Sequence, residues 1–285
     1  MKSTTPNADS YQVGWICAVL TEYVIACELL DEEYRTPPLS SIDDSNIYTC
    51  GRMGDFHVVV ACLPKGRYGL TSAATVAKDL LHSFPSIRFG LMVGIGGGAP
   101  TRIQDIRLGD IVVSAPTGRT GGVIHYEFGR TVQNKAFTPV GHLNAPPRVL
   151  LTAVQQLDAF HQRRGHQIPE TISQVIQRNP RLQNKYRRPP AETDILFQSP
   201  YLHQEDSRAC TDCCSVNNET TIPRPYRGHE ADEGNMIQVH YGLIASADRL
   251  LKDATVRDHL AETEGVLCFE MEAAGLMESF PCLVI

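Results

Sequence analysis

Short apolar runs, each closed by glycine, proline or a polar residue, constrain the fold of this chain more than any other feature of its sequence. They have the length of strands and lie at residues 11–20, 46–50, 56–63, 89–95, 111–114, 236–245, 266–269 and 282–285. Continuous apolar runs are typical of strands that are covered on both faces. From Ser72 to Phe84, apolar residues recur at helical spacing. Strands alternating with helices predict an α/β fold with a parallel or mixed sheet covered by helices.

Capping residues predict where other helices begin. Thr21 is expected to cap a helix over Glu22–Leu30, and Ser246 a helix over Asp248–Glu262. Further helices are predicted from the proline pair at 146–147 to about residue 161, and over residues 272–279.

Composition limits the classes of protein to which the chain can belong. Of its 285 residues, 42% are hydrophobic and 20% charged, which supports a sizeable core and excludes wholesale disorder. The net charge of −6 argues against a general nucleic-acid binder. No apolar run approaches the roughly 20 residues that span a bilayer, and the first residues carry no apolar signal core. We therefore expect no membrane partner and a cytoplasmic location.

The nine cysteines indicate reduced thiols, because most of them lie in apolar segments. We predict one domain over residues 11–285, with a long insertion at about 161–235 that is rich in Arg, Pro, Gln and Asn. The insertion carries part of a zinc spacing, in Cys210, Cys213 and Cys214 with His203 and His229 nearby. Because a second CxxC or HxxxH pair is missing, no metal site is predicted.

Three features of the sequence contain residues that could bind a ligand or take part in catalysis. The segment MVGIGGGAP at 92–100 ends a predicted strand in glycines, which lets a ligand approach the backbone, but it is neither a Walker nor a dinucleotide motif. The segment FEMEAAG at 269–275 places Glu270 and Glu272 between a strand and a helix, where carboxylates can accept hydrogen bonds from a diol. Glu22 follows the first strand. Taken singly, a tight turn explains the glycine loop equally well, and a favourable interaction with a helix dipole explains the three glutamates better.

The segments VGWICAVLTE, GLMVGIGGGAP, LGDIVVS, IASADRLL and CFEMEAAGL together resemble the purine-nucleoside and uridine phosphorylase superfamily. The resemblance covers most of residues 11–128 and 236–285. By motif the chain is similar to methylthioadenosine/adenosylhomocysteine nucleosidases, and it looks closest to a branch found at the N-terminus of fungal multidomain proteins, ahead of nucleotide-binding and repeat modules. The resemblance implies a three-layer α/β/α sandwich around a twisted mixed sheet, with the site at strand ends.

The resemblance also implies cleavage of an N-glycosidic bond through a ribosyl cation, without metal or organic cofactor. The substrate would be a purine nucleoside or nucleotide, with adenine as the expected base and ATP as one candidate. Glu272 matches the glutamate that holds the ribose hydroxyls, and Glu22 matches the one that positions the attacking water. The other residues expected to contact the substrate are Gly96, Gly97, Leu250, Leu251, Met271, Glu270 and His125. A substrate phosphate would meet Lys65, Arg67 and the helix start at Thr71.

Hydrolysis is favoured over phosphorolysis because Met92 stands where phosphorylases commonly carry an arginine for phosphate. In the family, the strand matching Cys282–Ile285 continues into a segment with the aspartate that protonates the base, followed by a final helix. The chain stops before that segment, so the resemblance implies a truncated strand and helix, with further domains downstream in a longer polypeptide. A phosphorylase, a catalytically impaired purine-binding regulatory domain and a partner-binding scaffold remain alternatives, and self-association into a homo-oligomer is expected.

Overall fold

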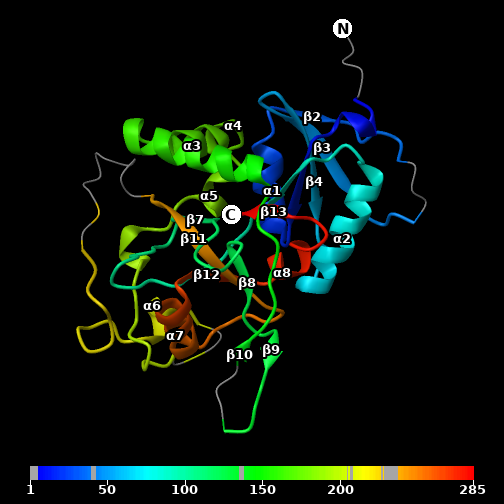
Figure 1. Ribbon diagram of the computed structural model, residues 1–285. Coiled ribbons are helices and arrows are strands. Elements are labelled where there is room, and N and C mark those ends of the chain that lie inside the picture. The colour runs from blue at the N-terminus through cyan, green and yellow to red at the C-terminus, as the bar shows by residue number, and fades with distance from the viewer. Residues whose placement is uncertain are drawn as a thin grey trace.

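A computed structural model gives the fold and describes residues 6–39, 43–134, 138–203, 205, 208–225, 227 and 237–285 (Figure 1). It contains one six-stranded and one five-stranded sheet. The strands of the larger sheet, in spatial order, are β13 (Cys282–Val284), β5 (Phe89–Met92), β1 (Val13–Cys17), β4 (Phe56–Cys62), β3 (Tyr48–Met53) and β2 (Glu32–Tyr34). Strands β13, β5, β1 and β4 pair in parallel, while β3 pairs antiparallel with β4 and β2.

The smaller sheet is built around the long strand β11. Its strands are β6 (Gly97–Gly98), β12 (Val266–Glu270), β11 (Val239–Ser246) and β7 (Ile111–Ser114), and β8 (Val123–His125) also pairs with β11. The two sheets meet where the N–H of Val284 donates to Ser114 Oγ at 3.0 Å. Strands β9 (Gly129–Arg130) and β10 (Thr138–Pro139) form a separate hairpin.

The helices cover the sheets. They are α1 (Leu20–Glu28), α2 (Leu70–Ser83), α3 (Arg148–Arg164), α4 (Ile168–Arg178), α5 (Gln183–Tyr186), α6 (Cys210–Cys213), α7 (Ala254–Glu264) and α8 (Ala273–Leu276), with 3-10 turns at Ala8–Ser10 and Ala191–Thr193. No helix among the described ranges has the length and apolar character needed to cross a bilayer.

Alternate residues of β1 bury against different helices. Ile16 packs into the cluster that contains Leu80 of α2, whereas Val13 and Trp15 pack into the cluster that contains Ala26 of α1. Successive strand residues point to opposite faces of a sheet, so β1 is covered on both sides. This confirms the predicted α/β/α arrangement around a mixed sheet, and it explains why the first strand is a continuous apolar run.

The periodicity over 72–84 is confirmed by α2, and the two predicted strands near 46–63 are the antiparallel pair β3 and β4. Both predicted caps are wrong. Val19, not Thr21, precedes α1, because the Glu22 carboxylate accepts the Val19 N–H at 3.1 Å. Ser246 is the buried last residue of β11, and α7 begins only after Asp253, whose carboxylate accepts two N–H groups of its first turn.

The predicted helix after the proline pair is confirmed by α3, which has Pro147 as its N-cap. The region predicted to be an insertion contains the end of α3 and all of α4, α5 and α6. Figure 1 shows α3 along the upper side of the molecule and the chain of α6 toward the lower side. The division into one domain with an insertion stays a prediction.

Gly275 allows α8 to pack directly on α2. A Cβ at this position would lie 2.2 Å from the carbonyl oxygen of Leu70 and 2.7 Å from its carbonyl carbon. Backbone atoms cannot move aside as a flexible side chain can, so we expect Gly275→Ala to cost about 1–3 kcal/mol of unfolding free energy or more. Urea denaturation would measure this loss. The matched control is Gly97→Ala, whose Cβ would have its nearest neighbour at 4.0 Å. Equal stability of both variants would contradict the tight contact.

Candidate active site

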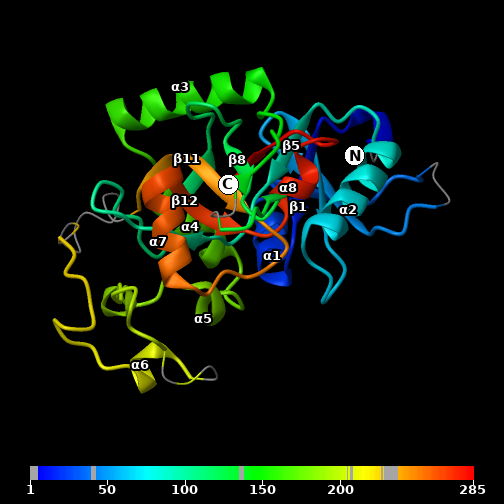
Figure 2. The same cartoon turned by 60° about the horizontal axis from the view of Figure 1, so that its bottom comes forward.

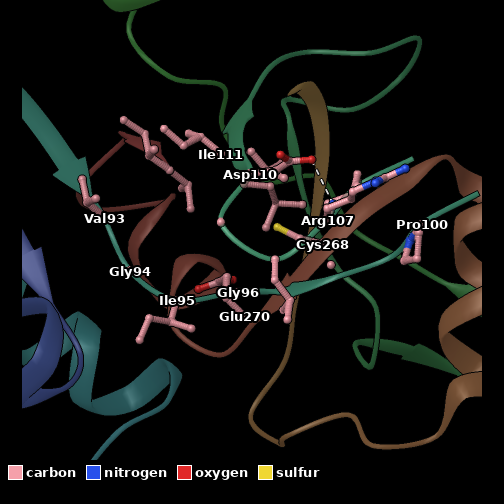
Figure 3. A pocket seen from close by; sticks show the side chains of 18 of the residues that line it. Val93, Gly94, Ile95, Gly96, Pro100, Arg107, Asp110, Ile111, Cys268 and Glu270 are labelled. Atoms are coloured by element: carbon pink, nitrogen blue, oxygen red, sulfur yellow. Dashed lines mark hydrogen bonds between the residues drawn. The ribbon is translucent and has the colours of Figure 1, made fainter. Parts of the chain in front are cut away.

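A cavity of about 570 Å³ opens beside the junction of the two sheets (Figure 3). Its wall includes the glycine-rich loop after β5, the end of β12 and the first residues of β7. Pockets of this size commonly hold small molecules. The carboxylates of Glu22, Glu270 and Glu272 all line it, although the first is separated from the others by most of the chain.

The carboxylate of Glu22 is fixed by backbone N–H groups on both sides. Its Oε2 accepts from Ala18 at 2.7 Å and from Val19 at 3.1 Å, and its Oε1 accepts from Ile95 at 2.8 Å. Gly94 makes this approach possible, since a Cβ there would lie 2.7 Å from Oε1. Glu22 therefore connects the turn after β1 to the glycine-rich loop. All three hydrogen bonds that hold its carboxylate come from backbone N–H groups.

Glu272 is the second fixed carboxylate and is only 6% exposed. Its Oε1 accepts the N–H of Gly69 at 3.0 Å, and its Oε2 accepts the N–H of Met271 at 3.2 Å. Burial raises the pKa of Glu272, the two N–H donors oppose that shift, and the negative charges of Glu22 and Asp248 add to it. Glu22 and Glu272 thus line the same cavity and are close enough to influence each other electrostatically.

Glu270 lies at the end of β12 and has one bound and one unbound oxygen. Its Oε2 accepts from the N–H groups of Glu272 and Ala273 at 2.8 and 2.9 Å. Its Oε1 is buried and has no hydrogen-bond partner among the described residues. Burial is the largest cause that raises the pKa of Glu270, to about 7, although the Ser246 hydroxyl and the N–H groups of Glu272 and Ala273 oppose this shift, so the carboxyl exchanges a proton near neutral pH.

The raised pKa of Glu270 predicts a pH-dependent cost to stability. The folded protein binds this proton more tightly than the unfolded chain, so the stability contribution is complete below about pH 4.5 and is lost as the pH rises through about 7. Glu270→Gln carries no charge at any pH, and its amide oxygen can still accept the two N–H groups. We expect the variant to match the natural protein near pH 4.5 and to exceed it at about pH 8, by at most about 3 kcal/mol.

Urea denaturation at several pH values would measure this difference. Glu262→Gln on the exposed side of α7 is the control, and it should show no such pH dependence. A constant difference between Glu270→Gln and the natural protein would contradict the shifted pKa.

Ion pairs surround the far wall of the cavity. The side chain of Asp110 is fully buried, and its carboxylate accepts from Arg227 Nη1 at 2.8 Å and pairs with His240 Nε2 at 3.0 Å. Burial opposes ionisation of Asp110, but the hydrogen bonds from these two side chains and from backbone N–H groups outweigh it and lower its pKa. The cavity is also lined by three arginines, each of which is paired with a carboxylate: Arg107 with Asp105, Arg224 with Asp194 and Arg257 with Asp258.

The structure brings some predicted residues to the cavity and leaves others outside its lining. Glu22, Gly96, Glu270 and Glu272 line it, and so does Met92. Residues absent from the lining are Gly97, Met271, Leu250, Leu251, His125, Lys65, Arg67 and Thr71. Leu250 is 69% exposed, and Lys65, Arg67 and Thr71 are exposed on the loop and helix start around Gly69. The ring of His125 stacks on that of Phe128, with 5.7 Å between the ring centroids. The roles of these residues stay predictions.

Sequence reasoning missed part of the wall. Asp194, Ile195, Leu196 and Arg224 line the cavity although they come from the region predicted to be a solvated insertion. No local signal identified them, because their place depends on ion pairs with the 105–107 segment. Asp110 lies in the LGDIVVS segment, where an acid directly before a buried strand was an unused signal.

Comparisons with known proteins identify a fold and a relative in sequence. No family model matches the chain. A nucleotide-binding leucine-rich repeat (NLR)-like protein of Hyaloscypha variabilis is 40% identical over 277 residues, which are 97% of this chain and 26% of that protein. The chain thus spans about a quarter of the length of this relative.

Two solved structures resemble the chain along most of its length. One is the 5'-methylthioadenosine/S-adenosylhomocysteine nucleosidase of Neisseria meningitidis in complex with methylthio-immucillin-A (TM-score 0.54, 16% identity, 96% of this chain and 83% of that chain). The other is the corresponding nucleosidase of S. pneumoniae with a transition-state inhibitor (TM-score 0.52, 14% identity, 96% and 83%). At these identities the likeness establishes a shared fold.

Proposed function

We propose that this chain, which has the nucleoside phosphorylase/nucleosidase fold, is an N-ribosyl hydrolase that cleaves the glycosidic bond of a purine nucleoside or nucleotide. The observation that carries the proposal is the presence of Glu22 and Glu272, from opposite ends of the chain, on one cavity of about 570 Å³. Adenine is the proposed base, because the two nucleosidases of the same fold act on adenine nucleosides, as their names state.

The proposed mechanism uses the charge of the two carboxylates. Breaking the glycosidic bond leaves positive charge on the ribosyl group, and nearby negative charge stabilises that charge more than it stabilises the neutral substrate. Glu272 has free lone pairs on both oxygens beyond its two N–H bonds, so it can accept hydrogen bonds from the ribose hydroxyls. Glu22 would orient a water molecule and take its proton as that water attacks C1′.

The departing purine must gain a proton or a strong hydrogen bond. Glu270 is the proposed donor in the cavity, because it lines the same cavity and its pKa of about 7 leaves it partly protonated at neutral pH. A general acid typically contributes about 10²–10⁴-fold to a rate. If Glu270 does not reach the base, the chain is the alternative that the sequence raised, a regulatory domain that binds purines without rapid cleavage.

Hydrolysis is proposed over phosphorolysis because the cavity offers no unpaired guanidinium among the residues that line it. Met92 is buried in the position where a phosphate-binding arginine is expected, and the three lining arginines are occupied by carboxylates. Inorganic phosphate binds best to free, bidentate guanidinium groups. We also propose that the protein works in the cytoplasm, as the thiols in its apolar segments indicate, and that it self-associates, as the family resemblance implies.

The proposed function is tested by incubating the purified chain with adenosine, methylthioadenosine, AMP or ATP and separating the products by chromatography. Free adenine should appear without added phosphate. Adenine that appears only with phosphate, together with the 1-phosphate of the substrate's own sugar (ribose 1-phosphate from adenosine), would replace the hydrolase by a phosphorylase. Purine binding by calorimetry without any adenine release would support the regulatory domain, and the absence of both binding and release would end the proposal.

A further inference from the structure

The loop between Phe197 and Thr221 carries cysteine and histidine residues, and its two ends lie next to each other. Its two ends are held together by the bridge between Phe197 and Thr221 and by a hydrogen bond from Gln198 N–H to the Thr220 carbonyl at 2.9 Å. Inside the loop, the Tyr201 hydroxyl accepts the Ser215 N–H at 2.9 Å. Figure 2 shows α6 and its chain at the outer edge, away from α2. The segment is therefore a closed loop with its own internal contacts.

Three side chains of this loop gather their donor atoms in one place. Cys213 Sγ lies 3.7 Å from His203 Nε2 and 3.8 Å from Cys214 Sγ, and all three atoms lie within 4.8 Å of one another. The thiols are reduced, and no other such group of three His, Cys, Asp or Glu residues occurs among the described residues. His229, also considered in the sequence, lies outside the described residues.

We propose that His203, Cys213 and Cys214 form a structural zinc site. Zinc bonds of about 2.3 Å to sulfur and about 2.0–2.1 Å to nitrogen, arranged as a tetrahedron, separate two sulfurs by about 3.8 Å and a sulfur from a nitrogen by about 3.6 Å. The observed separations of 3.8 and 3.7 Å match these edges of the coordination tetrahedron. One imidazole and two thiolates are also the donors that zinc prefers over magnesium or calcium.

Cys210 lies outside the group of three donor atoms but is the neighbouring thiol that would supply the fourth ligand. It begins α6, three residues before Cys213, so both lie on one side of a single helical turn, and its thiol interacts with that of Cys214. Zinc binding would release the thiol protons to solvent, and Cys213 would exchange its present contact with the Ala209 carbonyl at 3.3 Å for the metal. The charge on zinc would offset the thiolate charges.

Packing does not account for this cluster. The core cysteines Cys17 and Cys282 are fully buried among apolar residues, whereas His203 and Cys210 are exposed and the other two thiols are only partly covered. The loop has few apolar residues to order it, and small units of this kind often rely on metal. A zinc ion would supply the cross-link that a hydrophobic core supplies elsewhere.

The site would also fix one wall of the cavity. The N–H of Ile222 donates to the carbonyl of Leu196 at 2.8 Å, directly beside the loop ends, and both Leu196 and Arg224 line the cavity. Zinc would hold these two segments together from outside. The inference concerns the metal alone and does not depend on the proposed function.

Cobalt substitution tests the inference on the whole chain, kept reduced with a phosphine. Co²⁺ should produce a sulfur-to-cobalt charge-transfer band and the visible bands of tetrahedral coordination, with an endpoint of one ion per chain, and added Zn²⁺ should remove them. Native mass spectrometry of the zinc form should show one zinc per chain. Absence of the charge-transfer band would overturn the proposal.

Variants locate the metal. Cys213→Ser and His203→Ala should each weaken cobalt binding by about 100-fold or more, because each removes one of few strong ligands. Cys62→Ser is the matched control: Cys62 is a half-buried thiol on β4 near Cys27, and its loss should leave the bands unchanged. Loss of the bands in Cys62→Ser, or their full retention in Cys213→Ser, would place the metal elsewhere and overturn the assignment. Circular dichroism of each variant would verify that the chain is folded.

Discussion

Glu22→Gln is expected to lower kcat for adenine release by about 10²–10⁴-fold, the range for loss of a general base. The amide cannot take a proton from water. It also replaces one oxygen by an NH₂ group that would face either the N–H of Ile95 or those of Ala18 and Val19, where only an acceptor is tolerated. Affinity for a non-hydrolysable adenine nucleoside should change little, because the variant alters the water rather than the sugar contacts.

Steady-state kinetics and calorimetry on the same preparations separate these two effects. Glu28→Gln is the matched control on the same helix, since its carboxylate binds the Asn179 amide at 3.0 Å and does not line the cavity. It should keep natural turnover. Unchanged kcat in Glu22→Gln would remove this residue from the mechanism.

Glu272→Gln is expected to reduce kcat/KM by about 10²–10⁴-fold through lost ribose recognition. Hydrogen bonds to a charged group contribute about 1.5–3 kcal/mol each, and two ribose hydroxyls are involved. The substitution also puts an NH₂ group against the N–H of Gly69 or of Met271 and removes the negative charge that favours the ribosyl cation.

Comparing ligands with and without ribose distinguishes this role from a general loss of structure. Adenosine should bind at least about tenfold more weakly to Glu272→Gln, while free adenine should bind as it does to the natural protein. Glu278→Gln, on the exposed segment after α8, is the control and should be neutral. Equal weakening of adenosine and adenine would show that Glu272 does not act on the sugar.

Much of the fold could be predicted from local patterns. The buried strand β1 is a continuous apolar run because both of its faces are covered, and α2 shows the spacing of a half-buried helix. The residues that cap the helices were harder to predict than the strands and helices themselves. Ser246 and Asp253 are both good caps, and only burial of Ser246 at the end of β11 decides between them.

The site could be predicted only in part, because some of its residues are placed by contacts between segments that are distant in sequence. Glu22, Glu270 and Glu272 follow strand ends, where open α/β sheets bind their ligands, so their approach to one cavity was predictable. The wall formed by Asp194 and Arg224 was not, because an Arg-rich segment of low hydrophobicity has the composition of a solvated loop. Its placement comes from ion pairs between segments far apart in sequence, which no local pattern records.

The bond from Gly69 to Glu272 joins residues 203 positions apart. Chains grow on the ribosome at about 5–20 residues per second, so the first partner waits for roughly 10–40 s before the second is even synthesised. During that interval the nascent α2 has no α8 to cover it, and its exposed apolar side is a natural target for chaperones that shield unfinished chains. A ligand that binds at Glu272 can assist folding only after this wait, as a late stabiliser rather than as a nucleus.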